Sequence, residues 1–378
     1  MKKLVMCFDR TRRDCEPDTA TNASRLFHLL DDGADQLAWY HSSVGPGGTK
    51  MPRRCRTSAD DARAAITEAY QFLIDRWEPG DRIYLFGIGR GGYCAQALTR
   101  LLSTVGVLPE LMDYVLGAYA LPRTRRTRQD WMRVTQVASG LAQQREVPVP
   151  VRFLGLWDAL KVSGVPRWSM PDPMPNVEVG RHAVAIDGRP GERLVTSASG
   201  RIEEVWFRGA HRDVAGGADA CEPLAEITFD WMLDGALGAG LTLPAERMNT
   251  VPGPGLFDAL AETPPTISLR KLPENAAIHS SVELYLREHP RYWKRLPVHV
   301  AWSDRDWAAR GERLVRTQGA TAGRVPVDTA SFGSLSDPGS NGAESSPANG
   351  RDHPPTGQNC PIGEERRSSK STLEPISK

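Results

Sequence analysis

The feature that most constrains the fold is a strand-like run that ends in a glycine-rich turn. Residues 82–86 are rich in β-branched and aromatic side chains, which favour a buried strand. The sequence G-I-G-R-G-G follows at 87–92, and residues 90–102 are typical of a helix. Glycines at this spacing let the chain turn sharply, because they tolerate backbone conformations that other residues avoid. The sequence therefore predicts a strand–turn–helix unit.

Strands and helices are expected to alternate along the whole chain. Short apolar runs predict strands, and apolar residues at a 3.6-residue period predict helices. The expected strands are residues 3–8, 36–40, 82–86, 151–156 and 205–207. The expected helices are residues 23–30, 58–77, 90–102, 112–120, 126–143, 177–186 and 224–233. Such alternation predicts an α/β fold with a doubly wound, mostly parallel sheet covered by helices on both faces.

Composition divides the chain into three parts. Residues 1–240 carry the alternating elements and are expected to form the core. Residues 241–317 hold tryptophans and prolines and predict a loop-rich flank of the same domain. From residue 318 onward Ser, Gly, Pro and charged residues dominate, and Phe332 is the only aromatic residue. Such a segment cannot bury enough apolar surface to offset its ordering entropy, so residues 318–378 are expected to be a disordered tail.

Charge and cysteine content exclude several classes of protein. The 378 residues include 47 basic and 46 acidic side chains, a formal net charge of +1, so the strong basic field of a nucleic-acid-binding protein is missing. The six cysteines include no C-x-x-C pair, which is neither a zinc spacing nor a compact disulfide framework. We expect no nucleic-acid partner, no metal and no cofactor.

The distribution of apolar residues bears on location. No run of about 18 apolar residues is present, so no transmembrane segment is expected. The N-terminal apolar run stops at Asp9, too early for a secretory signal, which favours a cytoplasmic protein. Delivery by a secretion route that needs no such signal stays open.

The glycine-rich turn fits two patterns, and the first is a nucleotide site. Gly87-x-Gly89-x-x-Gly92 matches the fingerprint of dinucleotide-binding proteins, in which glycines let a pyrophosphate approach a helix N-terminus. That pattern needs an acid about 20 residues further on. Glu110 or Asp113 would have to serve, and neither clearly ends a second strand.

The second pattern is the nucleophile elbow G-x-S-x-G, with Gly87 and Gly91 as its flanking glycines. Those glycines are needed because the strand and the helix approach too closely for side chains. The middle residue points into the site from a strained conformation. Here that residue is Gly89, and the turn alone does not decide between the two patterns.

Further motifs occur in a fixed order between residues 4 and 233. They are F-D-R-T at 8–11, T-N at 21–22, P-G-D at 79–81, G-I-G-R-G-G-Y at 87–93, G-L-W-D at 155–158, R-H-A-V-A-I-D at 181–187 and W-F-R-G-A-H-R-D-V at 206–214. Together they resemble the α/β-hydrolase family that includes the phospholipase effectors of type VI secretion, once known only as an uncharacterised hydrolase domain. The resemblance implies an α/β-hydrolase fold and the machinery of an esterase or phospholipase.

The resemblance implies a triad in the chain order nucleophile, acid, base, at Gly89, Asp158 and His211. Asp158 would hold His211 in one tautomer and stabilise its imidazolium. A helix N-cap or a loop acid would also suit the place of Asp158 after a strand. His211 would equally suit a structural histidine in a glycine-rich loop.

The resemblance also places an oxyanion hole. Arg90, the residue after the nucleophile position, would donate one backbone N–H, and Arg10 or Thr11 the second. The residues that support the motifs are Asp9, Gly87, Gly91 and Asp213. Asp213 is expected either to accept hydrogen bonds from turn amides below the histidine loop or to act in the site.

Departures from the family pattern cluster in the expected site. Gly89 stands in place of the serine, Arg10 of a glycine and Ala159 of a threonine. Glycine has no oxygen to attack an ester, so no acyl-enzyme can form at this position. We expect a degenerate hydrolase that has no acyl-transfer activity and binds a lipid, an ester or a protein partner. The alternatives are hydrolysis by a water that His211 and Asp158 activate, and nucleotide binding at the glycine turn.

Overall fold

Eight strands lie side by side in one sheet, and every neighbouring pair is parallel. The computed structural model describes residues 1–9, 20–42, 58–109, 127–142, 147–162, 174–188, 201–251, 253–264 and 270–309. The strands are β1 Lys3–Phe8, β2 Gln36–His41, β3 Arg82–Ile88, β4 Val151–Trp157, β5 Val177–Ala185, β6 Ile202–Phe207, β7 Ala276–His279 and β8 Val300–Ser303. The predicted α/β fold is confirmed, and the sheet of the described chain is wholly parallel.

The strand order places the site. Across the sheet it is β2-β1-β3-β4-β5-β6-β7-β8, so the chain runs outward from β1 in one direction and then returns to build the rest on the other side. The order reverses between β1 and β3, and ligands of open parallel sheets bind at the carboxyl ends of the strands beside such a switch point. The glycine-rich turn follows β3 at that point.

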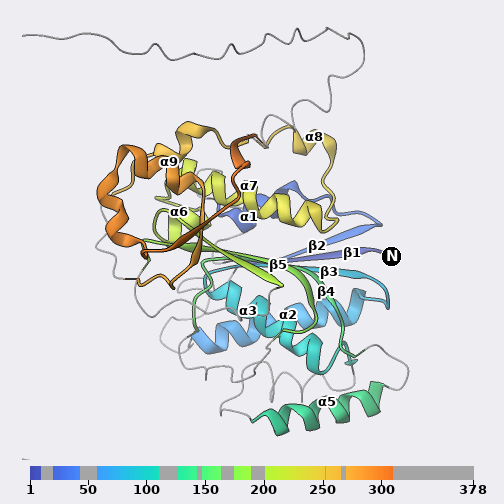
Figure 1. Ribbon diagram of the computed structural model, residues 1–378. Coiled ribbons are helices and arrows are strands. Elements are labelled where there is room, and N and C mark those ends of the chain that lie inside the picture. The colour runs from blue at the N-terminus through green and yellow to red at the C-terminus, as the bar shows by residue number, and fades with distance from the viewer. Residues whose placement is uncertain are drawn as a thin grey trace, which may run out of the picture. The chain divides into compact units, whose positions relative to one another are not determined.

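Helices cover both faces of the sheet (Figure 1). The helices of one face are α2 Ser58–Arg76, α3 Arg90–Thr104 and α5 Arg128–Ala142. Those of the other face are α1 Asn22–Leu29, α6 His211–Ala215 and α7 Glu222–Gly238. This two-sided cover explains the continuous apolar strands, since each strand buries side chains on both faces.

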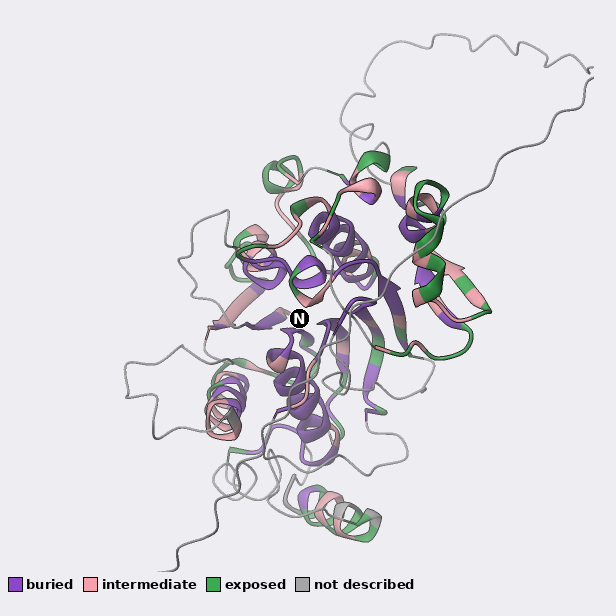
Figure 2. Cartoon of the chain, turned by 90° about the vertical axis from the view of Figure 1, so that its left-hand side faces the viewer, coloured by how far each residue is buried: buried purple, intermediate pink, exposed green. Residues whose placement is uncertain are grey.

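Strand β1 shows how the two apolar layers form. Leu4 and Met6 pack with the helices of one face, and Val5 and Cys7 with those of the other. All four are fully buried. Figure 2 shows the same burial through the centre of the sheet and the helices against it. Period-2 alternation of side chains thus divides one apolar run between two cores.

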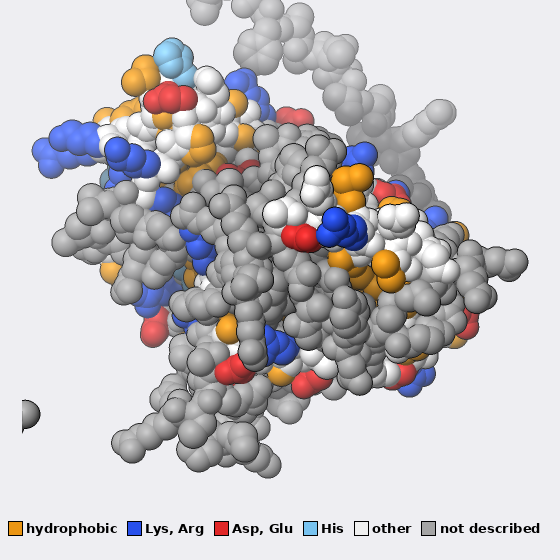
Figure 3. Space-filling view, turned by 90° about the horizontal axis from the view of Figure 1, so that it is seen from below, with side chains coloured by type: hydrophobic (Ala, Val, Ile, Leu, Met, Phe, Trp, Pro, Cys, Tyr) orange, Lys and Arg blue, Asp and Glu red, His pale blue; other side chains and the backbone are white. Residues whose placement is uncertain are grey.

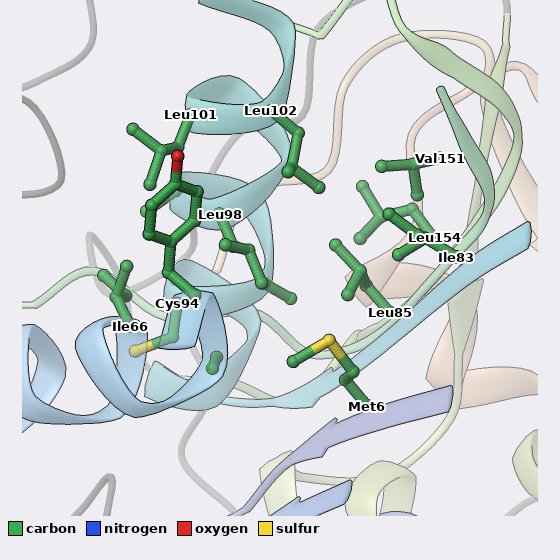
Figure 4. Close-up of a cluster of buried hydrophobic side chains, with 14 of the residues drawn as sticks. Met6, Ile66, Ile83, Leu85, Cys94, Leu98, Leu101, Leu102, Val151 and Leu154 are labelled. Carbon is green, nitrogen blue, oxygen red and sulfur yellow. The ribbon is translucent and has the colours of Figure 1, made fainter. Parts of the chain in front are cut away.

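The first of these cores lies between the sheet and α3 (Figure 4). Leu98 and Leu102 of α3 face Met6 and Leu85 of the strands, while Cys94 lies beside Ile66 of α2. Burial raises the pKa of the Cys94 thiol. This cysteine is fully buried and belongs to the apolar core.

The helix predicted at 177–186 is wrong, because these residues form β5. They pair with β4 on one side and β6 on the other. Gly180 lies so close to its neighbours that an added Cβ would be 3.1 Å from the Leu154 carbonyl oxygen. The end of β5 is buried on both faces, so its apolar residues do not alternate. The pairing with two neighbouring strands thus determines the secondary structure of this segment, which the local pattern of apolar residues could not predict.

The residues after α7 extend the sheet. Two short strands, β7 and β8, continue it beyond β6. The other elements here are α8 Ala245–Met248, η4 Leu256–Leu260, α9 Ser281–Glu288 and η5 Pro290–Arg295. Ile278 of β7 and Val282 of α9 are fully buried in a third apolar cluster with Trp206 of β6. We call residues 239–309 the flank.

Several expected features lie outside the described residues. These are the helix at 112–120, the tail at 318–378, and the residues Arg10, Thr11, Glu110 and Asp113. In the described part of the chain, no helix is both long enough and apolar enough to cross a membrane. On the face seen in Figure 3, side chains of both charges stand among apolar ones in the coloured part of the surface.

Candidate active site

The turn after β3 is shaped by close packing of backbone. An added Cβ at Gly87 would lie 2.6 Å from the Gly91 carbonyl carbon, and one at Gly91 would lie 2.3 Å from the Phe8 carbonyl oxygen. Neither backbone group can yield easily, so both positions require glycine. The strand and the helix meet here as the nucleophile elbow demands.

Gly89 is the residue between β3 and α3. Its φ of +54° and ψ of −115° lie in a region that side-chain-bearing residues rarely occupy. Its N–H donates to the Trp157 carbonyl at 3.0 Å, and its carbonyl accepts from the Leu160 N–H at 2.8 Å. The turn is therefore fixed to the carboxyl end of β4, on either side of Asp158.

Asp158 follows β4 and is fully buried. Its φ of +39° is also unusual for a residue with a side chain. Its Oδ2 lies 2.9 Å from His211 Nδ1, and its Oδ1 accepts from the Ala185 N–H at 3.1 Å. The carboxylate is thus aimed at the histidine from one strand and held by the next.

His211 is the first residue of α6, and 23% of its side chain is exposed. An added Cβ at Gly89 would lie 3.0 Å from its Cε1 and 3.2 Å from its Nε2. Leu160 Cδ1 would lie 3.6 Å from the same Cβ. The three positions predicted from distant parts of the chain, Gly89, Asp158 and His211, therefore lie together. With Nδ1–H donated to Asp158, the ring presents Nε2 to the space above Gly89.

Arg270 is a site residue that the sequence analysis missed. Its Nη1 lies 2.7 Å from Asp158 Oδ1 and donates to the Ala185 carbonyl at 2.7 Å, and its Nη2 lies 3.5 Å from Asp158 Oδ2. Only 5% of its side chain is exposed. Nothing in the local sequence marks it, because it stands in no motif and more than a hundred residues separate it from Asp158.

The charge state of Asp158 follows from these neighbours. Burial alone would raise the pKa of its carboxyl. The hydrogen bond and charge of His211 and the guanidinium of Arg270 outweigh burial and hold the pKa well below its usual range. The site therefore contains a carboxylate that stays ionised although it has no contact with solvent.

His182 of β5 is a second residue whose role was missed, although its motif was noted. It is fully buried, and its Nε2 accepts from the Ala159 N–H at 3.1 Å. Its Nδ1 lies 3.2 Å from Glu204 Oε2. An accepting Nε2 assigns the proton to Nδ1, so the ring supports the backbone next to Asp158.

Asp213 holds the histidine loop from inside. Its Oδ2 accepts from the Ala210 N–H at 2.8 Å, and its Oδ1 from the Cys221 N–H at 2.9 Å. Both donors are backbone amides, so this geometry corresponds to the structural alternative. Gly209 lies against it: an added Cβ there would be 2.6 Å from Asp213 Cβ.

Two hydroxyl groups hold Asp9 of the opening motif. Asp9 Oδ2 accepts hydrogen bonds from the Thr21 hydroxyl and, at 2.6 Å, from the Tyr40 hydroxyl. Arg90 begins α3, where first-turn N–H groups have no acceptor within the helix and can bind a ligand oxygen. The second expected donor, from Arg10 or Thr11, lies outside the described residues.

A metal centre finds no support in the described ranges. No three His, Cys, Asp or Glu side chains there are grouped to hold an ion. The chemistry available is that of a buried carboxylate, a partly exposed imidazole and the N-terminus of α3.

A family model matches more than half of the chain. The model of the catalytic domain of Tle1-like phospholipase effectors of the type VI secretion system (T6SS) matches residues 2–235. An uncharacterised protein of Saccharomyces cerevisiae is 29% identical over an alignment of 216 residues, which covers 50% of this chain and 32% of the yeast protein. The chain thus spans about a third of the length of that curated relative.

Two solved structures are similar at lower identity. An uncharacterised protein from Pseudomonas aeruginosa is 16% identical, with 65% of this chain and 47% of that chain covered and a TM-score of 0.34. A Tle1 effector bound to the VgrG spike from the Type 6 secretion system is 17% identical, with 57% and 51% covered and a TM-score of 0.31.

Proposed function

Because the chain belongs to the family of Tle1-like phospholipase effector catalytic domains, we propose that it is a degenerate member that binds an ester or lipid beside Gly89 and His211. In this proposal Gly89 stands where the family has its serine nucleophile. The observation that carries it is the assembled pair of Asp158 and His211 facing a turn that has no side chain.

The missing oxygen decides what chemistry is left. Acyl transfer needs a nucleophile that the histidine can deprotonate, and Gly89 supplies none. When one triad member is removed, only the residual rate of about 10³–10⁴-fold over water from the oxyanion hole and binding remains. The binding parts of the site, namely the N-terminus of α3 and the imidazole, do not depend on the serine.

A nucleotide site is less well supported by the same geometry. The fingerprint glycines at 87 and 92 are explained by contacts within the fold, because an added Cβ would lie 2.6 Å from the Gly91 carbonyl carbon or 2.7 Å from Ala159 Cβ, so a bound pyrophosphate is not needed to account for them. The ring of His211 lies over Gly89, close to where a phosphate would have to approach. Titration with NAD, FAD and ATP in a calorimeter tests this alternative, and we expect no heat of binding.

The main test measures binding and turnover in the same purified protein. We expect micelles of a non-hydrolysable ether phospholipid to bind, and Leu160→Arg to weaken this binding, because Leu160 lines the space above Gly89. Val137→Arg on the exposed surface of α5 is the matched control. Equal binding by all three proteins, or no binding by the wild type, would contradict the proposal.

A working hydrolase is the second candidate, and one observation favours it. The Asp158–His211 pair is fully formed, and His211 Nε2 lies 3.2 Å from the position that a Cβ of residue 89 would take. In that case p-nitrophenyl butyrate should be hydrolysed, and His211→Ala should abolish the turnover. We expect no such turnover in the wild type.

Restoring the serine separates the two candidates. Gly89→Ser places a hydroxyl next to His211, although the ring must move by a few tenths of an ångström to admit the Cβ. For a degenerate site we expect ester hydrolysis to appear only in Gly89→Ser and to vanish when His211→Ala is added. For a water-based hydrolase, the wild type would already be active and the serine would change the mechanism instead.

A further inference from the structure

The Asp158 carboxylate has a cationic partner from outside the family-matched segment. The match ends at residue 235, whereas Arg270 belongs to the flank. Its guanidinium is almost wholly buried and makes two contacts with the carboxylate. A buried arginine is costly unless it is paired and hydrogen-bonded, so this placement needs a compensating role.

The contacts of Arg270 fix the carboxylate in space. Nη1 bridges Asp158 Oδ1 and the Ala185 carbonyl, both at 2.7 Å, and so joins the ends of β4 and β5. Oδ1 is then shared between Arg270 and the Ala185 N–H. Oδ2 accepts from His211 Nδ1 at 2.9 Å, and its contact with Arg270 Nη2 is longer, at 3.5 Å. The orientation of the carboxylate follows from how its two oxygens are divided.

Gly188 leaves room for this arrangement. An added Cβ at Gly188 would lie 2.1 Å from Arg270 Cζ and 2.2 Å from its Nη2. The guanidinium therefore lies flat against a position that has no side chain. Alanine at this position would displace the guanidinium while leaving Arg270 and Asp158 in the sequence.

We propose that Arg270 is a positioning residue of the candidate site, which holds the Asp158 carboxylate so that Oδ2 accepts from His211 and Nε2 faces Gly89. This inference rests on the proposed function only in assuming that His211 contacts a ligand. The orientation of Asp158 by Arg270 does not depend on that assumption. A merely structural arginine would tie the flank to the core without affecting the state of His211. The two roles therefore differ in what they predict for the histidine.

The test follows the Nδ1–H proton of His211 by NMR in the full chain, assigned by its loss in His211→Gln. In Arg270→Gln we expect this hydrogen-bonded signal to shift strongly or disappear, and in Arg270→Lys to be partly kept. Gly188→Ala should reproduce the effect of Arg270→Gln, which keeps the test valid if the latter folds poorly.

Arg247→Gln is the matched control. Arg247 is also a flank arginine that binds core carbonyls, those of His28 and Leu30, but it does not contact Asp158. We expect its loss to leave the His211 signal unchanged. The proposal is overturned if Arg270→Gln and Gly188→Ala leave the signal unchanged, or if Arg247→Gln alters it equally.

A second readout uses the Gly89→Ser background if that variant hydrolyses esters. Adding Arg270→Gln should lower kcat by about 100-fold with a smaller change in KM, since misplacement by about 1 Å can cost that much. The NMR readout does not depend on any ligand or turnover. Failure of the proposed function and failure of the role of Arg270 can therefore be told apart.

Discussion

The family-matched segment, residues 2–235, and the flank contribute to the site in different ways. The matched segment supplies Gly89, Asp158 and His211, each at the end of a strand or the start of a helix and each inside a motif. The flank supplies two short strands and Arg270, and it contains no motif. A candidate site can therefore depend on a region without any sequence motif, when one buried side chain of that region contacts a residue of the site.

The largest effect is expected where the two regions meet. Asp158→Ala leaves the Arg270 guanidinium buried without its carboxylate, which typically costs about 3–5 kcal/mol of unfolding free energy. Urea denaturation of the variant and the wild type measures it. A loss below about 1 kcal/mol would show that the flank and the core are not coupled through this pair.

The acid dependence of stability offers a control for that prediction. The pKa of Asp158 is lowered in the folded protein. The contribution of its carboxylate to the free energy of unfolding is therefore fully present above the unfolded pKa of about 3.9, and it is lost as pH falls toward the folded pKa. The stability difference between the wild type and Asp158→Asn should therefore be constant near pH 7 and shrink below about pH 4. A constant difference down to pH 2 would argue against this assignment.

The next prediction asks whether the flank is as firmly packed as the core. Ile278 of β7 and Leu85 of β3 are both fully buried. Replacing either with alanine should cost about 2–5 kcal/mol, because each leaves a cavity. Denaturation followed by tryptophan fluorescence should show one transition for both variants. A separate early transition in Ile278→Ala would make the flank an independent unit.

Glycine substitutions compare rigid and movable neighbours. Gly91→Ala drives a Cβ against the Phe8 carbonyl, which cannot yield, and should cost about 1–3 kcal/mol. Gly188→Ala meets only the movable end of the Arg270 side chain, but displacing it separates the guanidinium from the buried Asp158 carboxylate, so the larger loss is expected for this variant. Melting temperatures of the two variants test the order, and the reverse order would contradict it.

The smallest effect is expected at the surface of the flank. Arg287 and Glu283 form an exposed i,i+4 pair on α9. Arg287→Ala should change the unfolding free energy by at most about 0.5 kcal/mol. Chemical denaturation at low and at high salt measures it. A loss above about 1 kcal/mol would mean that this part of the flank has a partner other than Glu283.

Most of the core could be predicted because its signals are local. The run from Lys3 to Phe8 predicts a strand by its own composition, and the glycines at 87–92 predict a turn by their own spacing. The segment 177–186 was mistaken for a helix because a strand buried on both faces loses its alternation. Only its neighbours, β4 and β6, determine its conformation.

The residues of the candidate site also divide into those that a sequence motif predicts and those that only the fold brings together. Gly89, Asp158 and His211 were predicted because a family resemblance supplied their order, and the structure brings them together. Their catalytic roles stay predictions. Arg270 and His182 were missed because a single polar residue carries no period and no spacing. Each acts on a group that is distant in sequence, and only the three-dimensional arrangement shows the contact.

The bond between Asp9 and Thr21 bears on how this chain can diverge. It joins the residue that follows β1 to the N-cap of α1, and the Thr21 hydroxyl also accepts from the Ser24 N–H. Because this bond joins the strand to the helix directly, their relative position need not depend on how many residues connect them, and doubling the length of a connection costs only about 0.6 kcal/mol. We therefore expect insertions between these two residues, whether by evolution or by an engineer, to leave the framework unchanged.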